Sequence, residues 1–268
     1  MNAISYNDIN EVEKIITHCN DDKIIIDINE KNENDEFLLL KAVEINGTKF
    51  IKLLMDYTDK NNLILDINNK NKMEEFPLLK AISNNSIEII QLLIDYTNRH
   101  DVSLNINSKD ISGNFPLLLS VHKNNNDIVK ILFDYANKNN IELNINDKDQ
   151  SGNYPLLKAI EKRNIPIIES IIEYANARSI ILQVNEKNED GIYPLLMASD
   201  YNNIKIVELL IQYSDQHDTI LNIEENDKRD IMNYKQNIYK LLVKHYKKHG
   251  KNLDNKRNSA FGFLKNIF

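Results

Sequence analysis

The sequence predicts an all-α repeat solenoid, built from stacked helix–turn–helix repeats with extended finger loops. Three sequence markers recur every 39 residues, and a fixed period of this size is typical of repeat proteins. Only 6 Gly and 5 Pro occur among 268 residues, so few positions interrupt helices. Hydrophobic residues make up 42% of the chain, which is enough apolar material for a folded core.

The three markers define the repeats. The first is an aromatic residue followed by Pro-Leu-Leu, which begins at Phe76, Phe115, Tyr154 and Tyr193, with a weaker copy at Phe37. The second is an Ile-Asn pair, which begins at Ile28, Ile67, Ile106 and Ile145 and continues as Val184-Asn185. The third is a single tyrosine, found at Tyr57, Tyr96, Tyr135, Tyr174 and Tyr213. Together they predict full repeats at 32–70, 71–109, 110–148, 149–187 and 188–226.

Residues 110–148 illustrate how one repeat begins. Asp110 to Gly113 have the composition of a type I turn, with Asp first and Gly fourth. Pro116 supplies the fixed φ angle that favours a first helical turn, and the leucines after it give a short apolar face. The run 124–126 is all Asn, and Asn tolerates left-handed backbone angles, so we expect a short loop there.

The second half of this repeat has two further elements. Residues 128–135 place apolar side chains three and four positions apart, which predicts a second helix. Residues 141–146 alternate apolar and polar side chains, which predicts extended chain with one buried side. Such a repeat has no means of burying its apolar faces alone, so neighbouring repeats must stack.

The repeat resembles the ankyrin repeat. Residues 77–81, followed by Asn85, 88–90 and 92–94, match the family pattern P-L-H-x-A, G-H-x-E-I-V and L-L-L without a gap. Asp66-Ile67-Asn68 resembles the D-V-N that ends the family repeat. The resemblance implies an ankyrin-like stack that binds proteins and has no catalytic activity.

The chain departs from the family pattern in four ways across the region of resemblance, residues 3–226. The family repeat is about 33 residues long, and the extra six follow the Leu-Leu-Ile run. The Gly that stops the family's second helix is absent, so we expect that helix to continue; its place is taken by Thr58, Thr97, Ala136, Ala175 and Ser214. Phe or Tyr and Leu replace the family's Thr and His, so we expect apolar contact there. Asp35 and Glu74 take the turn Gly position in the first two repeats.

The two ends differ from the repeats. Residues 1–31 are expected to be a truncated first repeat, because residues 3–9 resemble residues 81–87. Residues 227–249 space apolar side chains as a helix does and are predicted to form a capping helix. The last segment, 250–268, is a basic and aromatic tail.

Charge divides the chain between the repeats and the end. Residues 227–268 hold 11 Lys and Arg against 3 Asp and Glu, whereas the preceding residues hold 22 against 37. A solvated capping helix with a loose tail explains the basic end, since runs of like charge usually lie in water. One alternative is a surface for anionic membranes or nucleic acid that uses Lys244, Lys247 and Lys248. Another is docking of the tail on the acidic repeats.

No arrangement typical of catalysis or cofactor binding occurs in the sequence. Cys19 is the only cysteine, which excludes an internal disulfide and a site that needs two thiolates. His18 beside Cys19 falls at the tyrosine position of the period, so packing is favoured over catalysis. His245 and His249 are four apart, but Tyr246 stands where an H-E-x-x-H metal site has Glu. We therefore expect a protein that is not an enzyme and has no cofactor or metal.

Binding is instead expected on the fingers and on the exposed side of the first helices. Equivalent positions there vary between repeats, as a surface matched to a partner requires. The candidate partner-binding residues are Met73, Lys80, Ile111, Leu119, His122, Lys123, Glu161, Lys162, Ile192, Met197 and Tyr201. Leu119, Met197 and Tyr201, with Ile111 and Ile192, are the expected apolar anchors.

The leading hypothesis is therefore a non-catalytic scaffold that binds another protein through the finger and first-helix face. The alternatives are an adaptor that binds an anionic membrane or nucleic acid through its basic end, and a binding fragment of a longer multidomain protein. The expected state is a monomer. The start of the chain lacks the basic and apolar segments of a signal peptide, so we expect an intracellular, cytoplasmic location.

Overall fold

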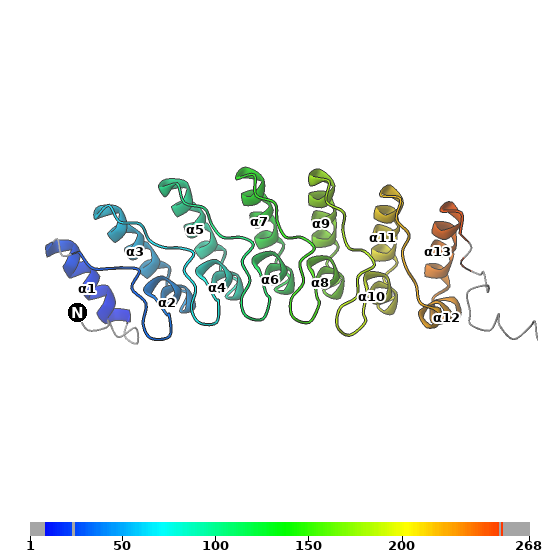
Figure 1. Ribbon diagram of the computed structural model, residues 1–268, viewed down its shortest axis with the longest axis horizontal. Coiled ribbons are helices and arrows are strands. Elements are labelled where there is room, and N and C mark those ends of the chain that lie inside the picture. The colour runs from blue at the N-terminus through cyan, green and yellow to red at the C-terminus, as the bar shows by residue number, and fades with distance from the viewer. Residues whose placement is uncertain (1–8, 23–24, 252, 254–268) are drawn as a thin grey trace, which may run out of the picture. The chain divides into compact units, whose positions relative to one another are not determined.

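The structure is a computed structural model that describes residues 9–22, 25–251 and 253. The described residues form thirteen helices and no strand (Figure 1). The helices are α1 (Ile9–Asp22), α2 (Leu38–Glu44), α3 (Thr48–Lys60), α4 (Pro77–Ser83), α5 (Ile87–His100), α6 (Pro116–His122), α7 (Asn126–Lys138), α8 (Pro155–Glu161), α9 (Ile165–Arg178), α10 (Pro194–Asp200), α11 (Ile204–Gln216), α12 (Glu225–Tyr234) and α13 (Gln236–Lys248). The chain divides into two compact units, an N-terminal unit of residues 1–162 and a C-terminal unit of residues 163–268.

The first helix of each repeat is short because its two ends are fixed by the sequence. The first helices α2, α4, α6, α8 and α10 have 7 residues each. In α6, Pro116 stands at the first helical position, where its missing N–H costs nothing, and Phe115 before it is extended. Asn124 then adopts the left-handed conformation with φ +57°, which confirms the predicted Asn loop. The equivalent left-handed residues are Asn46, Asn85, Arg163 and Asn202.

The second helices are longer, with 13 or 14 residues each. As predicted from the missing Gly, α3 continues past Thr58 and α5 continues past Thr97. Left-handed residues follow at the helix ends, at Asn62, Asp101, Asn140, Ser179 and Asp218. These helices stop where a residue leaves the right-handed backbone region.

In the N-terminal unit the first helices lie in one row and the second helices in another (Figure 1). α4 packs against α2 and α6, and α5 packs against α3 and α7. Leu78 of α4 and Leu117 of α6 are fully buried, although a single helix pair is too small to enclose them. In the C-terminal unit, α11 packs against α9, α10 and α13. Helices that pack in series confirm the predicted all-α repeat solenoid.

Tyrosines connect four of the second helices, α3, α5, α7 and α11, to the extended segment of the repeat before them. The hydroxyl of Tyr96 in α5 accepts a hydrogen bond of 2.7 Å from the backbone N–H of Leu65. Tyr57, Tyr135 and Tyr213 accept the equivalent bonds from Ile26, Leu104 and Leu182. These amides are buried and belong to no strand, so the tyrosines supply an acceptor that such amides need.

Asparagine side chains join successive extended segments in the same way. The Nδ2 of Asn68 donates to the carbonyl of Ser103 at 2.8 Å, and its Oδ1 accepts from the N–H of Asn105 at 2.9 Å. The same pair of bonds is made by Asn29, Asn107 and Asn185. The side-chain amide therefore bonds the next backbone as a paired strand would, which gives the Ile-Asn marker its structural role.

Lysines support the aromatic residue that precedes each first helix. Lys70 Nζ lies 5.7 Å from the centroid of the Phe76 ring and donates to the carbonyl of Lys109. Lys31 and Lys109 make the equivalent pair of contacts. Phe76 is fully buried, as expected for apolar contact at the family's Thr position, and the lysine adds hydrogen bonding between repeats.

The end of the C-terminal unit differs from the prediction of one capping helix over 227–249. It holds two helices, α12 and α13, separated by Lys235. α12 begins two residues after Ile223, whereas α10 begins ten residues after the equivalent Val184. The finger turn is therefore missing, and the period shortens from 39 to 32 residues between Tyr213 and His245. The capping element is a helix pair without a finger.

Two expectations concern segments outside the described residues. The resemblance of residues 3–9 to a first helix lies mostly before α1, which begins at Ile9. Most of the basic and aromatic tail, residues 254–268, also lies outside the part that the structure describes.

The tyrosine contacts lead to a prediction about stability. Tyr96→Phe keeps the buried ring but leaves the N–H of Leu65 without an acceptor, so the free energy of unfolding should fall by about 1–3 kcal/mol. Urea denaturation followed by circular dichroism measures the change. Tyr234→Phe is the control, because Tyr234 is 81% exposed and its replacement should have almost no effect. Equal stability of the two variants would contradict the role given to the hydroxyl.

Candidate functional site

Each finger turn, which is residues 110–114 in the repeat of α6, is held by the polar side chain of its first residue, the base of the finger. In the repeat of α6, Asp110 Oδ1 accepts from the N–H groups of Ser112 at 2.9 Å and Asn114 at 2.8 Å. The N–H of Gly113 donates to the Asp110 carbonyl at 3.0 Å, which closes the predicted turn. The same side-chain role belongs to Asn32, Asn71, Asp149 and Asn188. The fingers of both units are therefore hydrogen-bonded turns.

A second side chain completes the base of four fingers. Asn71 Nδ2 donates to Glu75 Oε2 at 2.9 Å, and the equivalent pair is Asn32 with Glu36. In the next two repeats the direction is reversed, because Asn114 donates to Asp110 and Asn153 donates to Asp149. A carboxylate therefore faces an amide in all four.

The turns that lack Gly in the first two repeats adopt the same backbone. Asp35 has φ +58° and Glu74 has φ +57°, where Gly113 has φ +80°. Both bond their N–H to the carbonyl of the residue at the base, Asn32 or Asn71. The base hydrogen bonds thus hold a turn that a side chain would otherwise disfavour.

The finger tips of the N-terminal unit place two of the predicted partner-binding residues side by side, and one of them, Ile111, is an expected apolar anchor. Met73 is 51% exposed and Ile111 is 45% exposed, and the N–H of Ile111 donates to the Met73 carbonyl at 3.3 Å. On the other side, the N–H of Gln150 donates to the Ser112 carbonyl at 3.2 Å. Neighbouring tips are therefore tied together, and they present an apolar pair to solvent.

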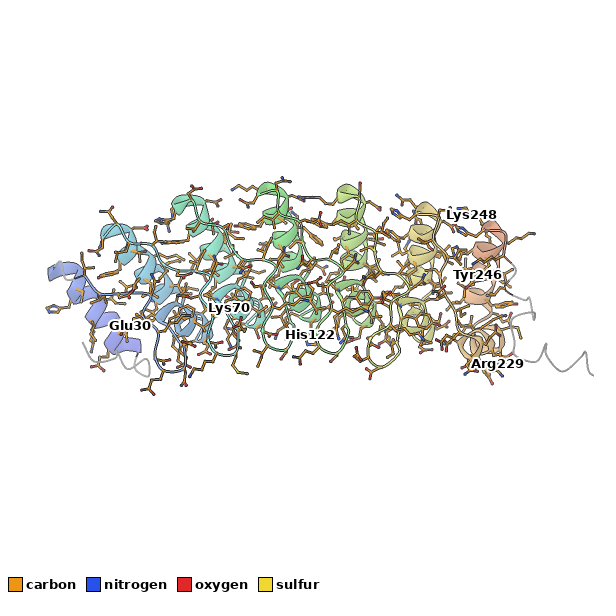
Figure 2. The ribbon with its side chains drawn as sticks, viewed as in Figure 1. Glu30, Lys70, His122, Arg229, Tyr246 and Lys248 are labelled. Carbon is orange, nitrogen blue, oxygen red and sulfur yellow. The ribbon has the colours of Figure 1, made fainter. Side chains whose placement is uncertain are left out.

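The first-helix face brings the other predicted residues of this unit together on three adjacent helices. Lys80 lies on α4, Leu119 and His122 lie on α6, and Glu161 lies on α8, while Lys123 and Lys162 directly follow α6 and α8. α6 packs between α4 and α8, and His122 stands at its C-terminal end (Figure 2). His122 and Lys123 are exposed, whereas the other members are partly covered.

Charge on this face changes along the row of helices. Lys80 Nζ lies 2.6 Å from Glu75 and 3.7 Å from Glu44, so its charge is compensated twice. Glu161 Oε2 lies 2.6 Å from Lys158, and its Oε1 lies 3.5 Å from Lys162. Burial alone would raise the pKa of Glu161, but these two lysines lower it below its ordinary value.

In the C-terminal unit the predicted anchors behave differently. Met197 is only 8% exposed, so the expectation that it is an exposed anchor is wrong. Tyr201 is partly covered, with the guanidinium of Arg163 4.0 Å from its ring centroid. Ile192 is also partly covered. At the Met197 position the other repeats carry Lys or, in α6, Leu119, and these side chains are partly exposed. Sequence alone did not distinguish the buried copy from the partly exposed ones.

The three lysines predicted to bind anions lie on α13, and Figure 2 shows Lys248 at its end. Lys244, Lys247 and Lys248 are exposed, as a surface for anions requires. Lys248 Nζ, however, donates to Asp215 Oδ2 at 2.8 Å. Lys244 and Lys247 therefore carry most of the uncompensated positive charge of this trio.

His245 occupies the tyrosine position of the shortened last repeat. Its Nε2 lies 3.3 Å from the backbone N of Leu221. This contact is equivalent to the hydrogen bond that the Leu182 N–H donates to the Tyr213 hydroxyl in the preceding repeat. Because the amide is a donor, Nε2 must accept, and the ring proton therefore lies on Nδ1. Nδ1 donates to Asp215 Oδ1 at 2.6 Å. Histidine thus replaces tyrosine as acceptor. The 39-residue period did not predict this role, because His245 follows Tyr213 by only 32 residues.

Asp215, His245 and His249 also form a cluster whose ligand atoms lie within 4.8 Å of one another. Hydrogen bonds from Lys248, His245 and His249 overcome the effect of burial and lower the pKa of Asp215 to about 2. If His245 bound a metal through Nδ1, its ring proton would lie on Nε2. Two donors, the Nε2–H of His245 and the N–H of Leu221, would then face each other. The residues therefore fit a hydrogen-bonded network better than a metal site.

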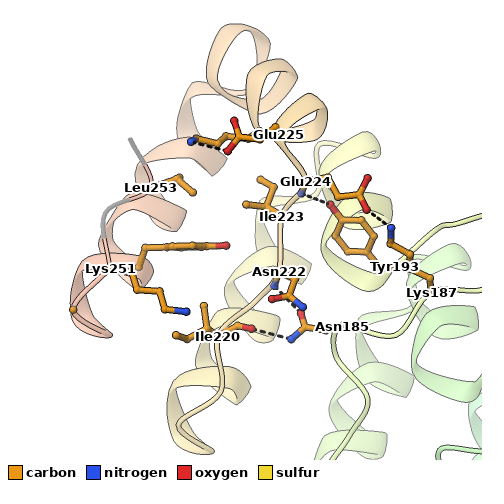
Figure 3. Close-up of a pocket in the computed structure, with 13 residues that line it drawn as sticks. Asn185, Lys187, Tyr193, Ile220, Asn222, Ile223, Glu224, Glu225, Lys251 and Leu253 are labelled. Atoms are coloured by element: carbon orange, nitrogen blue, oxygen red, sulfur yellow. Dashed lines mark hydrogen bonds and ion pairs between the residues drawn. The ribbon is translucent and has the colours of Figure 1, made fainter. Parts of the chain in front are cut away.

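A cleft of the C-terminal unit lies where the last finger is missing. It has a volume of about 650 Å³, and Tyr193, Glu224 and Lys251 are among its lining residues (Figure 3). Lys187 bonds to the side chain of Glu224 there, instead of to the carbonyl of a following finger. The cleft therefore follows from the shortened repeat.

His18 and Cys19 lie on different sides of α1. Cys19 is buried with Val12 and Ile16, which form the apolar stripe of the helix. His18 is exposed, so the expectation that it packs like the tyrosines is wrong. The two side chains therefore do not form a nucleophile and base pair.

A family model described as ankyrin repeats in three copies matches residues 1–106 and 60–147. The chain belongs to the ankyrin repeat family. Ankyrin repeats are generally modules of protein–protein interaction and typically act as non-catalytic scaffolds. None of the curated proteins compared with this ankyrin repeat chain matches it. Among the described helices, none has both the length and the apolar character needed to span a membrane.

Stacking of the finger turns leads to a second prediction about stability. A Cβ at Gly113 would lie 3.0 Å from the Cα of Asp149 and 3.0 Å from the N of Gln150, whereas one at Gly191 would meet nothing. Both glycines have positive φ, so each Ala variant carries a similar backbone cost of about 1 kcal/mol. Gly113→Ala should lower the melting temperature clearly more than Gly191→Ala. Equal shifts would contradict close finger packing.

Burial of His245 leads to a prediction about pH. Burial lowers the pKa of His245 below its ordinary value of 6.5, against the opposing effect of Asp215, and His249 and Lys248 lower it further. The unfolded chain then binds the proton more readily, so the stabilisation is present above pH 6.5 and is lost as pH falls below it. Protection of the Leu221 amide from hydrogen exchange should therefore be constant above about pH 6.5 and fall as the pH decreases below it.

The Leu182 amide is the control for that measurement, because it bonds to the Tyr213 hydroxyl, whose pKa is raised by burial. Its protection, corrected for the intrinsic effect of pH, should stay constant. Parallel loss of protection at both amides would contradict the role of His245.

Proposed function

We propose that this chain is a non-catalytic scaffold that binds another protein through the finger tips and first-helix face of its N-terminal unit. The observation that supports this most is the exposed pair of Met73 and Ile111 on hydrogen-bonded turns. Apolar side chains on a rigid support lose little conformational freedom when a partner covers them. The mixed apolar and charged first-helix face is continuous with these turns along the repeats.

The arrangement of the titratable groups supports a binding role over catalysis. Asp215 is engaged by His245, His249 and Lys248 in a network that links α11 and α13. Cys19 is buried and His18 points elsewhere. The carboxylates at the finger bases accept hydrogen bonds within their own turns. A structural role therefore accounts for Asp215, for Cys19 and for the carboxylates of the finger bases.

A second candidate function is association with anionic surfaces through α13. Lys244 and Lys247 are exposed and near each other on the helix, which favours it. The bond between Lys248 and Asp215 weighs against it, because it removes one of the three charges. Binding to vesicles with anionic lipid that disappears at moderate salt would support this function.

The scaffold proposal is tested by changing the finger tips. Met73→Asp with Ile111→Asp places two charges where apolar contact is proposed, so proteins captured from a cell lysate by the intact chain should be lost. Quantitative mass spectrometry of the captured proteins measures the loss. Ile64→Asp is the control, because Ile64 is 49% exposed but lies on the extended segment after α3. Capture that survives the double change would remove the finger tips from the binding surface.

A further inference from the structure

The face of α6 and α8 differs from the face of α2 and α4 in its balance of charge. On α2 and α4, Lys41 and Lys80 are compensated by Glu44, with Glu75 as a second partner of Lys80. On α8 and just after it, the single Glu161 serves both Lys158 and Lys162. This half of the face therefore has an excess of positive charge.

Lys123 adds to that excess. It follows α6 directly, its side chain is exposed, and no carboxylate lies within ion-pair distance of it in the described structure. The pKa of the neighbouring His122 responds to these charges. Burial lowers it first, Lys162 and Lys158 lower it further, and Glu161 opposes them only in part. Near the C-terminal ends of these two helices, lysine side chains therefore outnumber carboxylates.

An apolar side chain lies within this basic surface. Leu119 is one helical turn before His122 and Lys123, so the three share one side of α6. Leu119 is partly exposed, and it occupies the position where α4 and α8 carry Lys80 and Lys158. The surface therefore combines one apolar contact with lysines on the adjoining helix.

We propose that the surface formed by Leu119, Lys123, Lys158 and Lys162 binds a carboxylate-rich peptide segment of the partner, with one apolar side chain seated on Leu119. This inference rests on the proposed scaffold function and names the chemistry of its partner. Acidic side chains complement the lysines, and the apolar residue fixes the register of the segment.

A short acidic peptide fits the surface better than a nucleic acid. The N-terminal unit holds 26 Asp and Glu against 18 Lys and Arg, so a long polyanion would meet repulsion beyond the small basic surface. Nucleic acid binding also gains most of its affinity from many phosphate contacts, and the surface offers three lysines. A peptide needs to contact only the region around Leu119.

Selection from a random peptide display library on the intact chain tests the inference. The enriched peptides should be rich in Asp and Glu around an apolar residue. Their affinity, measured by fluorescence anisotropy, should fall at least about tenfold in the Lys123→Glu, Lys162→Glu variant, because like charges then face each other. The control is Lys49→Glu with Lys130→Glu, which changes the net charge equally at exposed positions of α3 and α7. The control should bind as the unchanged chain does.

Each other outcome decides against the inference. Enriched peptides that are neutral or basic, or acidic peptides that bind both charge variants equally, would overturn it and leave the scaffold function standing. Oligothymidylate that binds the chain more tightly than any enriched peptide, and is lost in Lys123→Glu, Lys162→Glu, would show that the surface serves nucleic acid instead. Failure to enrich any peptide over a urea-unfolded chain would count against both proposals.

Discussion

The structure depends on satisfying backbone groups in extended segments that belong to no β-sheet. Each helix pair leaves such a segment beside the next pair, and buried N–H groups without acceptors are costly. Tyr96 provides a hydroxyl for the N–H of Leu65, and Asn68 bonds both a carbonyl and an N–H of the following segment. These contacts all join one repeat to its neighbour. The same bonds that satisfy the backbone therefore fix the spacing between repeats.

That spacing explains how the C-terminal unit ends. After Tyr213 the next acceptor comes 32 residues later, at His245, and the finger is lost from the intervening segment. Histidine performs the acceptor role only when neutral, so Asp215 holds its proton on Nδ1. The arrangement of Asp215, His245 and His249 suggested a metal site by composition. The direction of the Leu221 amide is what favours a structural network.

Much of the fold follows from the sequence because the determining signals are local. Pro116 and Asn124 mark the ends of a short helix by their own backbone preferences, and the period follows from simple comparison. The covering of Met197 depends on which neighbours lie over one position, and spacing does not contain that information. The 39-residue period did not predict two capping helices, because the period is shorter at this end. The spacing of 32 residues between Leu221 and Leu253 is the sequence signal that indicates the shorter period. In the candidate site, the exposure of Met73 and Ile111 could be predicted from the sequence, because finger turns project from the stacked helices.

The paired side chains at the finger bases bear on how such a chain is able to change over evolutionary time. Asn71 with Glu75, and Asp110 with Asn114, are alternative solutions in which both partners come from one finger. A gene duplication or deletion that copies or removes a complete period carries the matched pair with it. Exchange of one member alone would set carboxylate against carboxylate or leave two amides to reorient. Tandem copying of entire modules is therefore an easier route to a longer or shorter chain than piecemeal substitution.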